Sequence, residues 1–181
     1  MTVRCFVDAS VFLHARDRRD PVKQARAADW LQRLWQQRSG RTSIQALSEF
    51  YFVMTKRLKP PVAEDLAWDE VARYLAWAPQ EANDAWLRRA RDLARRYPLS
   101  WWDAGIVAAA QMQDCVLLLT DQLADGLVFG SLAVRDPFGS VLEEPATEYQ
   151  PPGSPNSPCV PPFGGCQAGD RHALRPVTAE A

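Results

Sequence analysis

Two short apolar segments, each followed by an aspartate, constrain the fold of this chain more than any other feature. The first lies within Val3–Leu13 and is rich in β-branched and aromatic residues up to Asp8, which is the pattern of a buried strand. The second, Val116–Thr120, precedes Asp121 and is apolar enough for a parallel strand covered on both faces. Because ligands of open α/β sheets bind at the carboxyl ends of strands, Asp8 is either a turn residue or the first part of an active site.

Segments with helical spacing lie between these strands. Asp20-Pro21 is a helix-start signal, with Asp as the N-cap and Pro at the first helical position, and this helix ends at Ser39-Gly40. Further helices are predicted over 45–58, 63–77, 81–96 and 100–113. The tip of a short second strand is predicted at 42–44, where Thr42 or Ser43 can cap the next helix, and a last strand is predicted at 132–135. Strands that alternate with helices predict an α/β fold, namely a three-layer α/β/α domain with a mostly parallel central sheet.

The length and composition are those of a soluble globular protein. The chain has 181 residues, 47% of them hydrophobic and 24% charged, which is enough for one well-buried domain. No segment approaches the roughly 18 apolar residues that a membrane span needs. Asp8 also interrupts the N-terminal apolar stretch that a signal peptide would require, so we expect a cytoplasmic protein without a membrane partner.

The character of the sequence changes at Gly139. Eight of the 14 prolines fall in 139–181, together with repeated Gly, Ser and Glu and few large apolar residues. Such a segment cannot bury enough surface to offset the entropy that is lost on ordering. We therefore predict a folded domain over 1–138 and a disordered Pro/Gly-rich tail over 139–181.

The four cysteines do not indicate a metal site. Cys5 and Cys115 lie in apolar, strand-like surroundings, which is typical of small core residues rather than of ligands or a disulfide. Cys159 and Cys166 lie in the tail near His172, but their spacing matches none of the usual zinc patterns.

Four acids fall where one edge of the predicted sheet could collect them: Asp8, Glu49, Asp103 and Asp121. Asp8 and Asp121 follow strands, and the other two lie near the starts of helices. Each also has an ordinary explanation. Asp8 could cap or turn the chain, Glu49 could be a solvated residue favoured by the positive end of its helix, and Asp103 completes a Ser100-x-x-Asp103 sequence that resembles a capping box. Asp121 and Asp125 could be loop acids.

Taken together, the four acids favour a metal site. Carboxylates held close to one another raise each other's pKa unless a cation neutralises them. A set of oxygen ligands without histidine selects a hard ion, Mg²⁺ or Mn²⁺. Such ions activate a water molecule and stabilise the charge on a phosphodiester under attack.

The segments around these acids resemble those of the PIN-domain family, and most of all the VapC-type toxins of bacterial toxin–antitoxin pairs. Their order and spacing match over about residues 1–138, and the final segment is similar to the "NPF" ending of one branch of the family. The matching segments are Phe6-Val7-Asp8-Ala9-Ser10, Leu47-Ser48-Glu49-Phe50-Tyr51, Ser100-Trp101-Trp102-Asp103-Ala104, Leu118-Leu119-Thr120-Asp121 and Val134-Arg135-Asp136-Pro137-Phe138.

The resemblance implies a small metal-dependent ribonuclease, usually dimeric, that a cognate antitoxin protein inhibits. Asp8, Glu49 and Asp103 match the metal-binding acids of the family, and Ser10 matches a hydroxyl that could orient Asp8 or a metal-bound water. The family often has its fourth acid two residues after the Thr or Ser that ends the strand, where this chain has Gln122. Asp121, one residue earlier, and Asp125, a turn later, are the candidates for that role.

Clusters of basic residues, rather than the total charge, carry any argument about RNA, because residues 1–138 hold 19 Lys and Arg against 17 Asp and Glu. One cluster lies close in sequence to Ser10: Arg16, Arg18, Arg19, Lys23 and Arg26. Another is Arg88, Arg89, Arg91, Arg95 and Arg96, partly balanced by Asp84 and Asp92. Either cluster could be a solvated helix face. If one of them neutralises RNA phosphates beside the acids, we favour Arg16, Arg18 and Arg19.

Two tryptophans, Trp101 and Trp102, stand beside Asp103. We expect them in the core rather than stacked on RNA bases.

The leading hypothesis is a Mg²⁺-dependent endoribonuclease, the toxin of a VapBC-type pair, in which Asp8, Glu49, Asp103 and Asp121 hold the ion whose bound water attacks RNA. A second hypothesis is a PIN-fold module that binds RNA or protein with weak or no catalysis, because Gln122 costs it a ligand. A third makes Asp8 a phosphoryl-accepting nucleophile. It has less support, because the usual pattern has a second Asp where this chain has Ser10.

Overall fold

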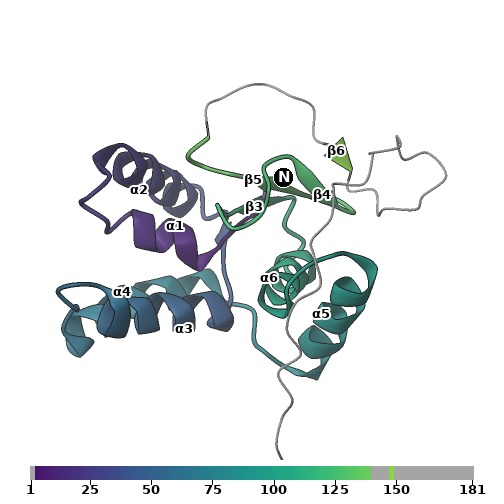
Figure 1. The fold of residues 1–181 in the computed structure, drawn as a ribbon, viewed down its shortest axis with the longest axis horizontal. Coiled ribbons are helices and arrows are strands. Elements are labelled where there is room, and N and C mark those ends of the chain that lie inside the picture. The colour runs from purple at the N-terminus through teal and green to yellow at the C-terminus, as the bar shows by residue number, and fades with distance from the viewer. Residues whose placement is uncertain (1–2, 140–146, 149–181) are drawn as a thin grey trace, which may run out of the picture. The chain divides into compact units, whose positions relative to one another are not determined.

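One mixed sheet organises the residues that this computed structural model describes, which are 3–139 and 147–148 (Figure 1). In this part of the chain the strand order is β2-β1-β3-β5-β4-β6. The strands are β1 (Cys5–Val7), β2 (Gly40–Arg41), β3 (Leu117–Leu119), β4 (Leu127–Phe129), β5 (Leu132–Arg135) and β6 (Thr147–Glu148). The helices are α1 (Ala9–His14), α2 (Pro21–Gln36), α3 (Ile44–Phe52), a π-helix (Val53–Arg57), α4 (Glu64–Tyr74), a 3-10 helix (Leu75–Trp77), α5 (Asp84–Arg96) and α6 (Trp101–Met112).

The centre of the sheet is parallel, as predicted. β1 pairs in parallel with β2 and β3, and β3 pairs in parallel with β5. The register sets Val7 beside Leu119 and Leu119 beside Arg135, so these strands end at one edge of the sheet. Asp8 follows β1 and therefore emerges at this edge, where a ligand site is expected.

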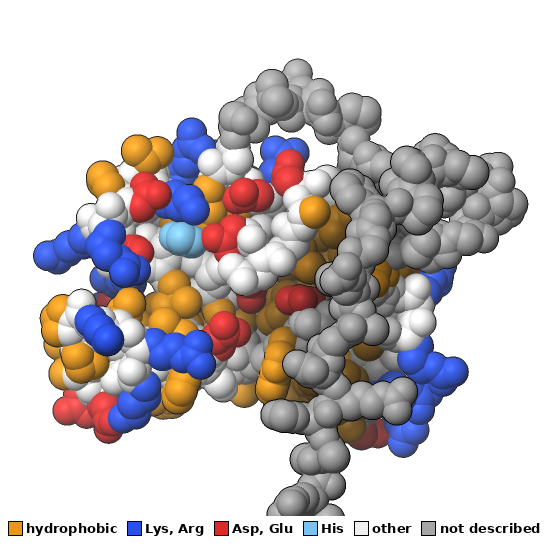
Figure 2. Space-filling view, in the orientation of Figure 1, with side chains coloured by type: hydrophobic (Ala, Val, Ile, Leu, Met, Phe, Trp, Pro, Cys, Tyr) orange, Lys and Arg blue, Asp and Glu red, His pale blue; other side chains and the backbone are white. Residues whose placement is uncertain are grey.

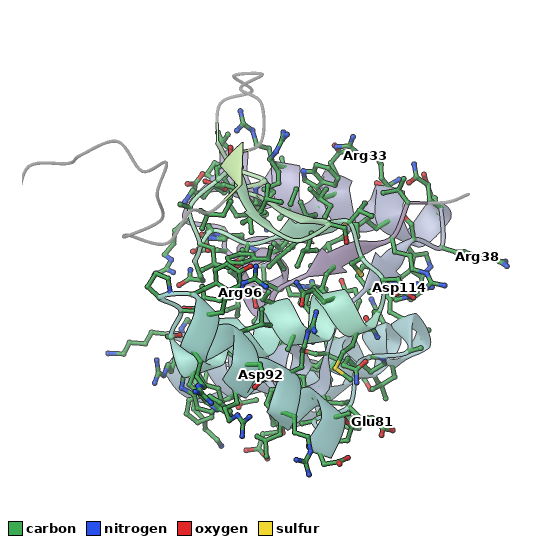
Figure 3. All side chains as sticks on the ribbon, turned by 90° about the vertical axis from the view of Figure 1, so that its right-hand side faces the viewer. Arg33, Arg38, Glu81, Asp92, Arg96 and Asp114 are labelled. Carbon is green, nitrogen blue, oxygen red and sulfur yellow. The ribbon has the colours of Figure 1, made fainter. Side chains whose placement is uncertain are left out.

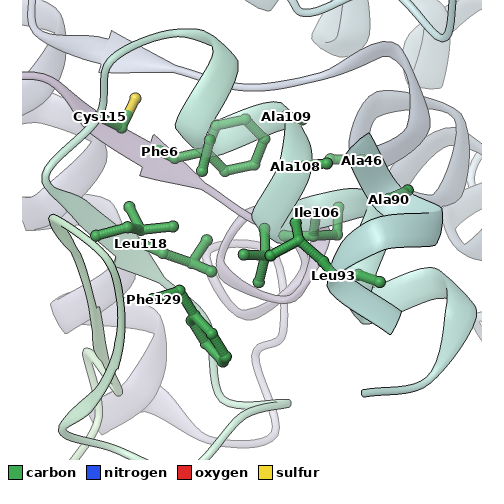
Figure 4. Packing of buried hydrophobic residues seen from close by; sticks show 14 of the residues in the cluster. Phe6, Ala46, Ala90, Leu93, Ile106, Ala108, Ala109, Cys115, Leu118 and Phe129 are labelled. Atoms are coloured by element: carbon green, nitrogen blue, oxygen red, sulfur yellow. The ribbon is translucent and has the colours of Figure 1, made fainter. Parts of the chain in front are cut away.

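Helices cover both faces of the sheet, which confirms the α/β fold. Phe6 and Leu118 pack into a cluster with α5 and α6, whereas the next residues, Val7 and Leu119, pack into a cluster with α1–α4. This alternation follows from the two-residue period of a strand. The two groups of helices are separate in Figure 1. Figure 4 shows Phe6 beside Ala109 of α6, with Leu118 and Phe129 on one side of this cluster and Ala90 and Leu93 of α5 on the other.

Several predicted boundaries need correction. No helix was predicted at α1, which begins at Ala9 directly after the three-residue strand β1. The second strand, whose tip was predicted at 42–44, ends earlier: β2 is Gly40–Arg41, and the Ser43 hydroxyl already accepts a hydrogen bond from Ala46 N as the N-cap of α3. The helix predicted over 45–58 changes at Val53 into the π-helix.

The β4–β5 hairpin was also missed. β4 runs antiparallel to β5, and the tight connection between them contains Gly130 with a φ of +69°. Glycine adopts this left-handed conformation without the steric cost of a Cβ atom. In the sequence, Asp125-Gly126 indicated a turn leading to the last strand, but the three residues of β4 were too few to give a pattern.

The predicted tail, 139–181, lies outside the described residues except for Gly139 and β6. β6 pairs in parallel with β4. The division into 1–138 and 139–181 stays a prediction, and Cys159, Cys166 and His172 fall outside the described residues.

Cys5 and Cys115 are buried free thiols, as expected of core residues. Burial raises the pKa of Cys115 to about 12, which makes it a weak nucleophile at neutral pH. Within the described ranges, no helix combines the length and the apolarity that crossing a membrane requires.

Candidate active site

A pocket of about 780 Å³ opens at the carboxyl end of β1, and three of the four predicted acids line it. Asp8 comes from the β1–α1 junction, Glu49 from α3 and Asp103 from the first turn of α6. Ser10 and Gln122 also line the pocket. In Figure 2, acidic side chains lie across the middle of the face that the view shows, between the side chains of α1–α4 and those of α5. The fold thus brings together acids that are 41 and 54 residues apart in sequence.

Asp8 is the most buried of the three acids, with only 6% of its surface exposed. As the N-cap of α1, it accepts a hydrogen bond from Ala9 N at 2.7 Å. Its other carboxylate oxygen accepts hydrogen bonds from Thr120 Oγ1 at 2.8 Å and from Ser10 Oγ at 3.2 Å. The expected capping role and the expected support from Ser10 are therefore both present, and neither excludes a role for Asp8 in the pocket.

Burial raises the pKa of Asp8 to about 6, and the negative charge of Glu49 adds to the rise. The hydrogen bonds from Thr120, Ala9 and Ser10 act in the opposite direction but do not cancel it. Asp8 thus carries a costly negative charge at neutral pH, which a nearby cation would stabilise.

Thr120 was not predicted as a site residue. It is 1% exposed and follows β3, and its hydroxyl reaches Asp8 because β1 and β3 are parallel neighbours. Asp8 N also donates to Leu119 O at 3.1 Å, which fixes the end of β1 against β3. Because Val7 pairs with Leu119, the next residues, Asp8 and Thr120, lie side by side. This register would have identified Thr120, but it cannot be predicted from either segment alone.

Asp103 combines both of its predicted roles. Ser100 Oγ accepts a hydrogen bond from Asp103 N at 3.1 Å and donates one to Asp103 Oδ2 at 2.6 Å. This local cap fixes the first turn of α6, and that turn presents Asp103 to the pocket. Glu49 is more exposed and lies on the side of α3 opposite to the buried Leu47 and Phe50.

Asp121 and Asp125 do not line the pocket. Asp121 Oδ2 lies 2.7 Å from His14 Nε2, and its Oδ1 accepts a hydrogen bond from Gln122 Nε2 at 2.6 Å. Although burial acts to raise it, these hydrogen bonds hold the pKa of Asp121 below its usual value. Asp125 accepts a hydrogen bond from Asp136 N at 2.8 Å beside the β4–β5 hairpin.

The donor chemistry of the pocket suits a hard divalent cation, since its three acids offer only oxygen and one of them is buried with a raised pKa. As the side chains stand, no three acidic, His or Cys residues of the described chain are arranged to hold an ion together. Asp8 and Asp103 instead satisfy their oxygens with local hydroxyl and amide donors. Binding a cation would therefore require these side chains to exchange hydrogen bonds for metal contacts.

The predicted RNA-binding arginines lie outside the pocket lining. Arg16 forms an ion pair with Glu70, and Arg19 forms one with Asp17 at 2.8 Å. Arg18 is exposed. In the second cluster, Arg91 lies 3.1 Å from Asp92, and Figure 3 shows Asp92 and Arg96 on the outer side of α5.

The prediction that Trp101 and Trp102 are core residues is wrong. They are 41% and 68% exposed, because they precede the buried part of α6. The buried face of α6 begins at Ala104. Trp102 and Arg57, neither of them predicted as site residues, line the pocket.

The family model of the PIN domain matches this chain over residues 5–123. This range contains all three acids of the pocket together with Ser10 and Thr120. The chain belongs to the PIN-domain family. PIN domains are typically metal-dependent nucleases, and the family generally uses a divalent metal.

Among solved structures, this PIN domain is similar to the crystal structure of VapC20 from Mycobacterium tuberculosis, described as a Sarcin-Ricin loop cleaving toxin. The identity is 18% and the TM-score is 0.48, and the match covers 63% of this chain and 86% of the other. None of the curated proteins matches the chain at a significant level.

Proposed function

We propose that this PIN domain is a metal-dependent endoribonuclease that hydrolyses RNA phosphodiester bonds. The observation that carries the proposal is the meeting of Asp8, Glu49 and Asp103, from three separate elements, in one pocket at the carboxyl edge of the sheet. The raised pKa of Asp8 supports it, since strongly perturbed acids in a pocket are frequent at functional sites.

In this proposal Asp8, Glu49 and Asp103 would hold Mg²⁺ or Mn²⁺. When bound, the cation would neutralise the acids and polarise both a water molecule and the phosphate under attack. Thr120 and Ser10 keep the Asp8 carboxylate facing the carboxyl edge of the sheet through their hydrogen bonds. The Ser100 cap fixes the turn that carries Asp103.

Asp121 has a different part in this proposal. His14 and Gln122 occupy its two carboxylate oxygens, and it does not line the pocket. We therefore assign it a supporting role beside Ser10 rather than direct contact with the metal, and we assign no metal role to Asp125.

We further propose that the chain is the toxin of a VapBC-type pair, with a cognate antitoxin as its partner and a homodimer as its oligomeric state. The support is the set of VapC-like segments around the acids, including the ending Val134–Phe138. Large apolar side chains left exposed on α2 and α4, outside the pocket lining, suit a protein partner: Val22 and Leu66 are each 62% exposed.

A cleavage assay on the full chain tests the nuclease proposal. We expect the wild type to cut single-stranded RNA with Mg²⁺ and to stop when EDTA is added, and we expect Glu49→Gln and Asp103→Asn to lose at least about 100-fold in rate. Asp114→Asn is the matched control, because Asp114 is an exposed acid outside the pocket that pairs with Arg4. Full activity in the Asp103→Asn variant would contradict the proposal.

One observation favours a second candidate, an RNA-binding module with little catalysis. In the described residues no three acids are placed to hold an ion together, and the acids are already hydrogen-bonded. A wild-type protein that binds RNA tightly but yields no product over long incubation with Mg²⁺ or Mn²⁺ would support this candidate over the nuclease.

A further inference from the structure

Two exposed aromatic side chains line the same pocket as the three acids. Trp102 is 68% exposed and Phe52 is 48% exposed. They come from different elements, Trp102 from the first turn of α6 and Phe52 from the end of α3. Large apolar side chains that stay exposed in a concave site commonly mark a ligand-binding surface.

The pocket is also lined by a basic residue, Arg57. Its guanidinium lies over the ring of Phe52, 5.5 Å from the ring centroid, which orients the planar group without neutralising it. Within the described residues Arg57 has no carboxylate partner, whereas the preceding Lys56 pairs with Glu64 at 2.7 Å. Arg57 therefore offers the pocket a positive charge with its hydrogen-bond donors available.

The π-helix explains why Arg57 faces the pocket. In an α-helix, eight residues would leave Arg57 about 80° around the axis from Glu49. A π-helix has more residues per turn and rotates the chain less for each residue. The Leu58 N to Val53 O hydrogen bond, at 3.0 Å, is the i to i+5 bond that marks this wider turn. Arg57 thereby returns to the stripe of α3 that carries Glu49 and Phe52.

Contacts between helices hold the first turn of α6 across the pocket from α3. Gln45 Nε2 donates to Trp102 O at 3.1 Å, so the backbone that carries Trp102 is tied directly to α3. Trp86 Nε1 donates to Gly105 O at 2.9 Å and fixes the next turn from the side of α5. Trp102 thus occupies a defined place at the pocket rather than the end of a loose loop.

We propose that Trp102 stacks an unpaired nucleobase of the RNA substrate and that Arg57 binds a phosphate of the same strand. The proposal rests on the proposed function only in taking RNA as the ligand. Base stacking on an aromatic side chain suits a flat and exposed ring, and a guanidinium suits the paired oxygens of a phosphate. In a pocket with three acids, Arg57 is the group that can attract a polyanion. The volume of about 780 Å³ lies within the range of ligand pockets.

Fluorescence anisotropy with a labelled single-stranded RNA tests the proposal. The protein is the full chain with Asp8→Asn, which prevents cleavage during the titration. We expect Trp102→Ala to weaken binding by about tenfold or more and Trp102→Phe to restore most of it. The matched control is Trp68→Ala, because Trp68 is similarly exposed on α4 but lies outside the pocket lining.

The salt dependence separates the two residues. Arg57→Gln should lower the slope of log affinity against log salt by about 0.7, the value for one phosphate contact on a single strand. Trp102→Ala should leave this slope unchanged, because stacking releases no counterion. A fully paired RNA of the same length should bind more weakly than the single strand and should not distinguish Trp102 from Ala.

Equal weakening by Trp102→Ala and Trp68→Ala, or none by either, would overturn the proposal. A Trp102→Ala variant with unchanged RNA affinity but an altered oligomeric state would also overturn it, since the face would then serve a second copy of the chain. The result is independent of the nuclease proposal. If RNA binding depends on Trp102 but the wild type cleaves no RNA, the nuclease proposal is contradicted and the proposed stacking of a base on Trp102 is supported.

Discussion

Asp8 shows how one side chain can serve both the fold and the site. Its carboxylate caps α1 and ties β1 to β3 through Thr120, so local structure accounts for its position. Local structure does not account for its burial beside Glu49, which raises its pKa to about 6. A capping aspartate on the surface would have its pKa lowered by the helix N-terminus and would stabilise the helix as a charged group. The arrangement gives up stability at neutral pH in favour of a charge in the pocket.

The stability of the metal-free protein should therefore depend on pH through Asp8. Because its pKa is higher in the folded than in the unfolded chain, the folded state binds more protons between about pH 4 and 6, and this contribution to stability falls as the pH rises. In EDTA at pH 7, Asp8→Asn should raise the free energy of unfolding by about 1–3 kcal/mol. Urea denaturation checks this value.

The gain from Asp8→Asn should shrink toward zero at pH 4, where Asp8 is protonated in the wild type as well. Asp114→Asn, an exposed acid paired with Arg4, should change little at either pH. A loss of stability on Asp8→Asn at pH 7 would show that the capping role of Asp8 outweighs the cost of its charge.

At the scale of elements, sequence signals located helix starts well and short strands poorly. Asp20 and Ser100 cap their helices as predicted, because capping depends on residues within one turn. α1, β2 and β4 have between two and six residues, too few to show a period, and they form because neighbouring strands and helices pack against them. Arg57 was not predicted to line the pocket for a similar reason, because its position there depends on the five-residue π-helix, which the sequence pattern does not show.

A substitution at Gly105 tests how tightly α6 packs against Gln45 of α3 and Trp86 of α5. A Cβ atom there would lie 2.5 Å from Gln45 Oε1 and 2.8 Å from Trp86 Cζ2, and the indole is fixed by its hydrogen bond to Gly105 O. Alanine is better than glycine in a helix by about 1 kcal/mol, but overpacking costs about 1–3 kcal/mol. We expect Gly105→Ala to lower the melting temperature and to weaken RNA binding through Trp102.

Gln45→Ala in the Gly105→Ala background should recover part of the lost stability, because it removes one of the two close atoms. Thermal unfolding of the single and double variants measures this recovery. A Gly105→Ala protein that is more stable than the wild type would show that helix propensity, rather than packing, decides at this position.

At the scale of the whole molecule, the sequence predicted the architecture and three of the acids that the pocket gathers. Alternating strands and helices were enough for the parallel α/β fold, because each strand end in such a sheet has a predictable edge. The sequence could not predict which acid at that edge would face the pocket. Asp8 comes directly after β1, whereas Asp121 comes one residue later after β3, behind Thr120, and its side chain pairs with His14, a contact 107 residues away.

The exposure of Trp101 and Trp102 was missed for a related reason. Tryptophan is highly buried on average, and only the packing of α6, which buries residues from Ala104 onward, shows that these two are exposed. Local sequence thus determines that the acids lie at a strand end or near the start of a helix, whereas long-range packing determines which other residues surround them.

Mg²⁺ binding to the full chain, measured by titration calorimetry, tests most directly whether three acids from three elements act as one metal site. We predict saturable binding by the wild type and an affinity at least about tenfold lower for each of Asp8→Asn, Glu49→Gln and Asp103→Asn, with little change for Asp121→Asn or Asp114→Asn. Unchanged Mg²⁺ affinity in the Asp8→Asn, Glu49→Gln and Asp103→Asn variants, or no binding by the wild type, would contradict the account.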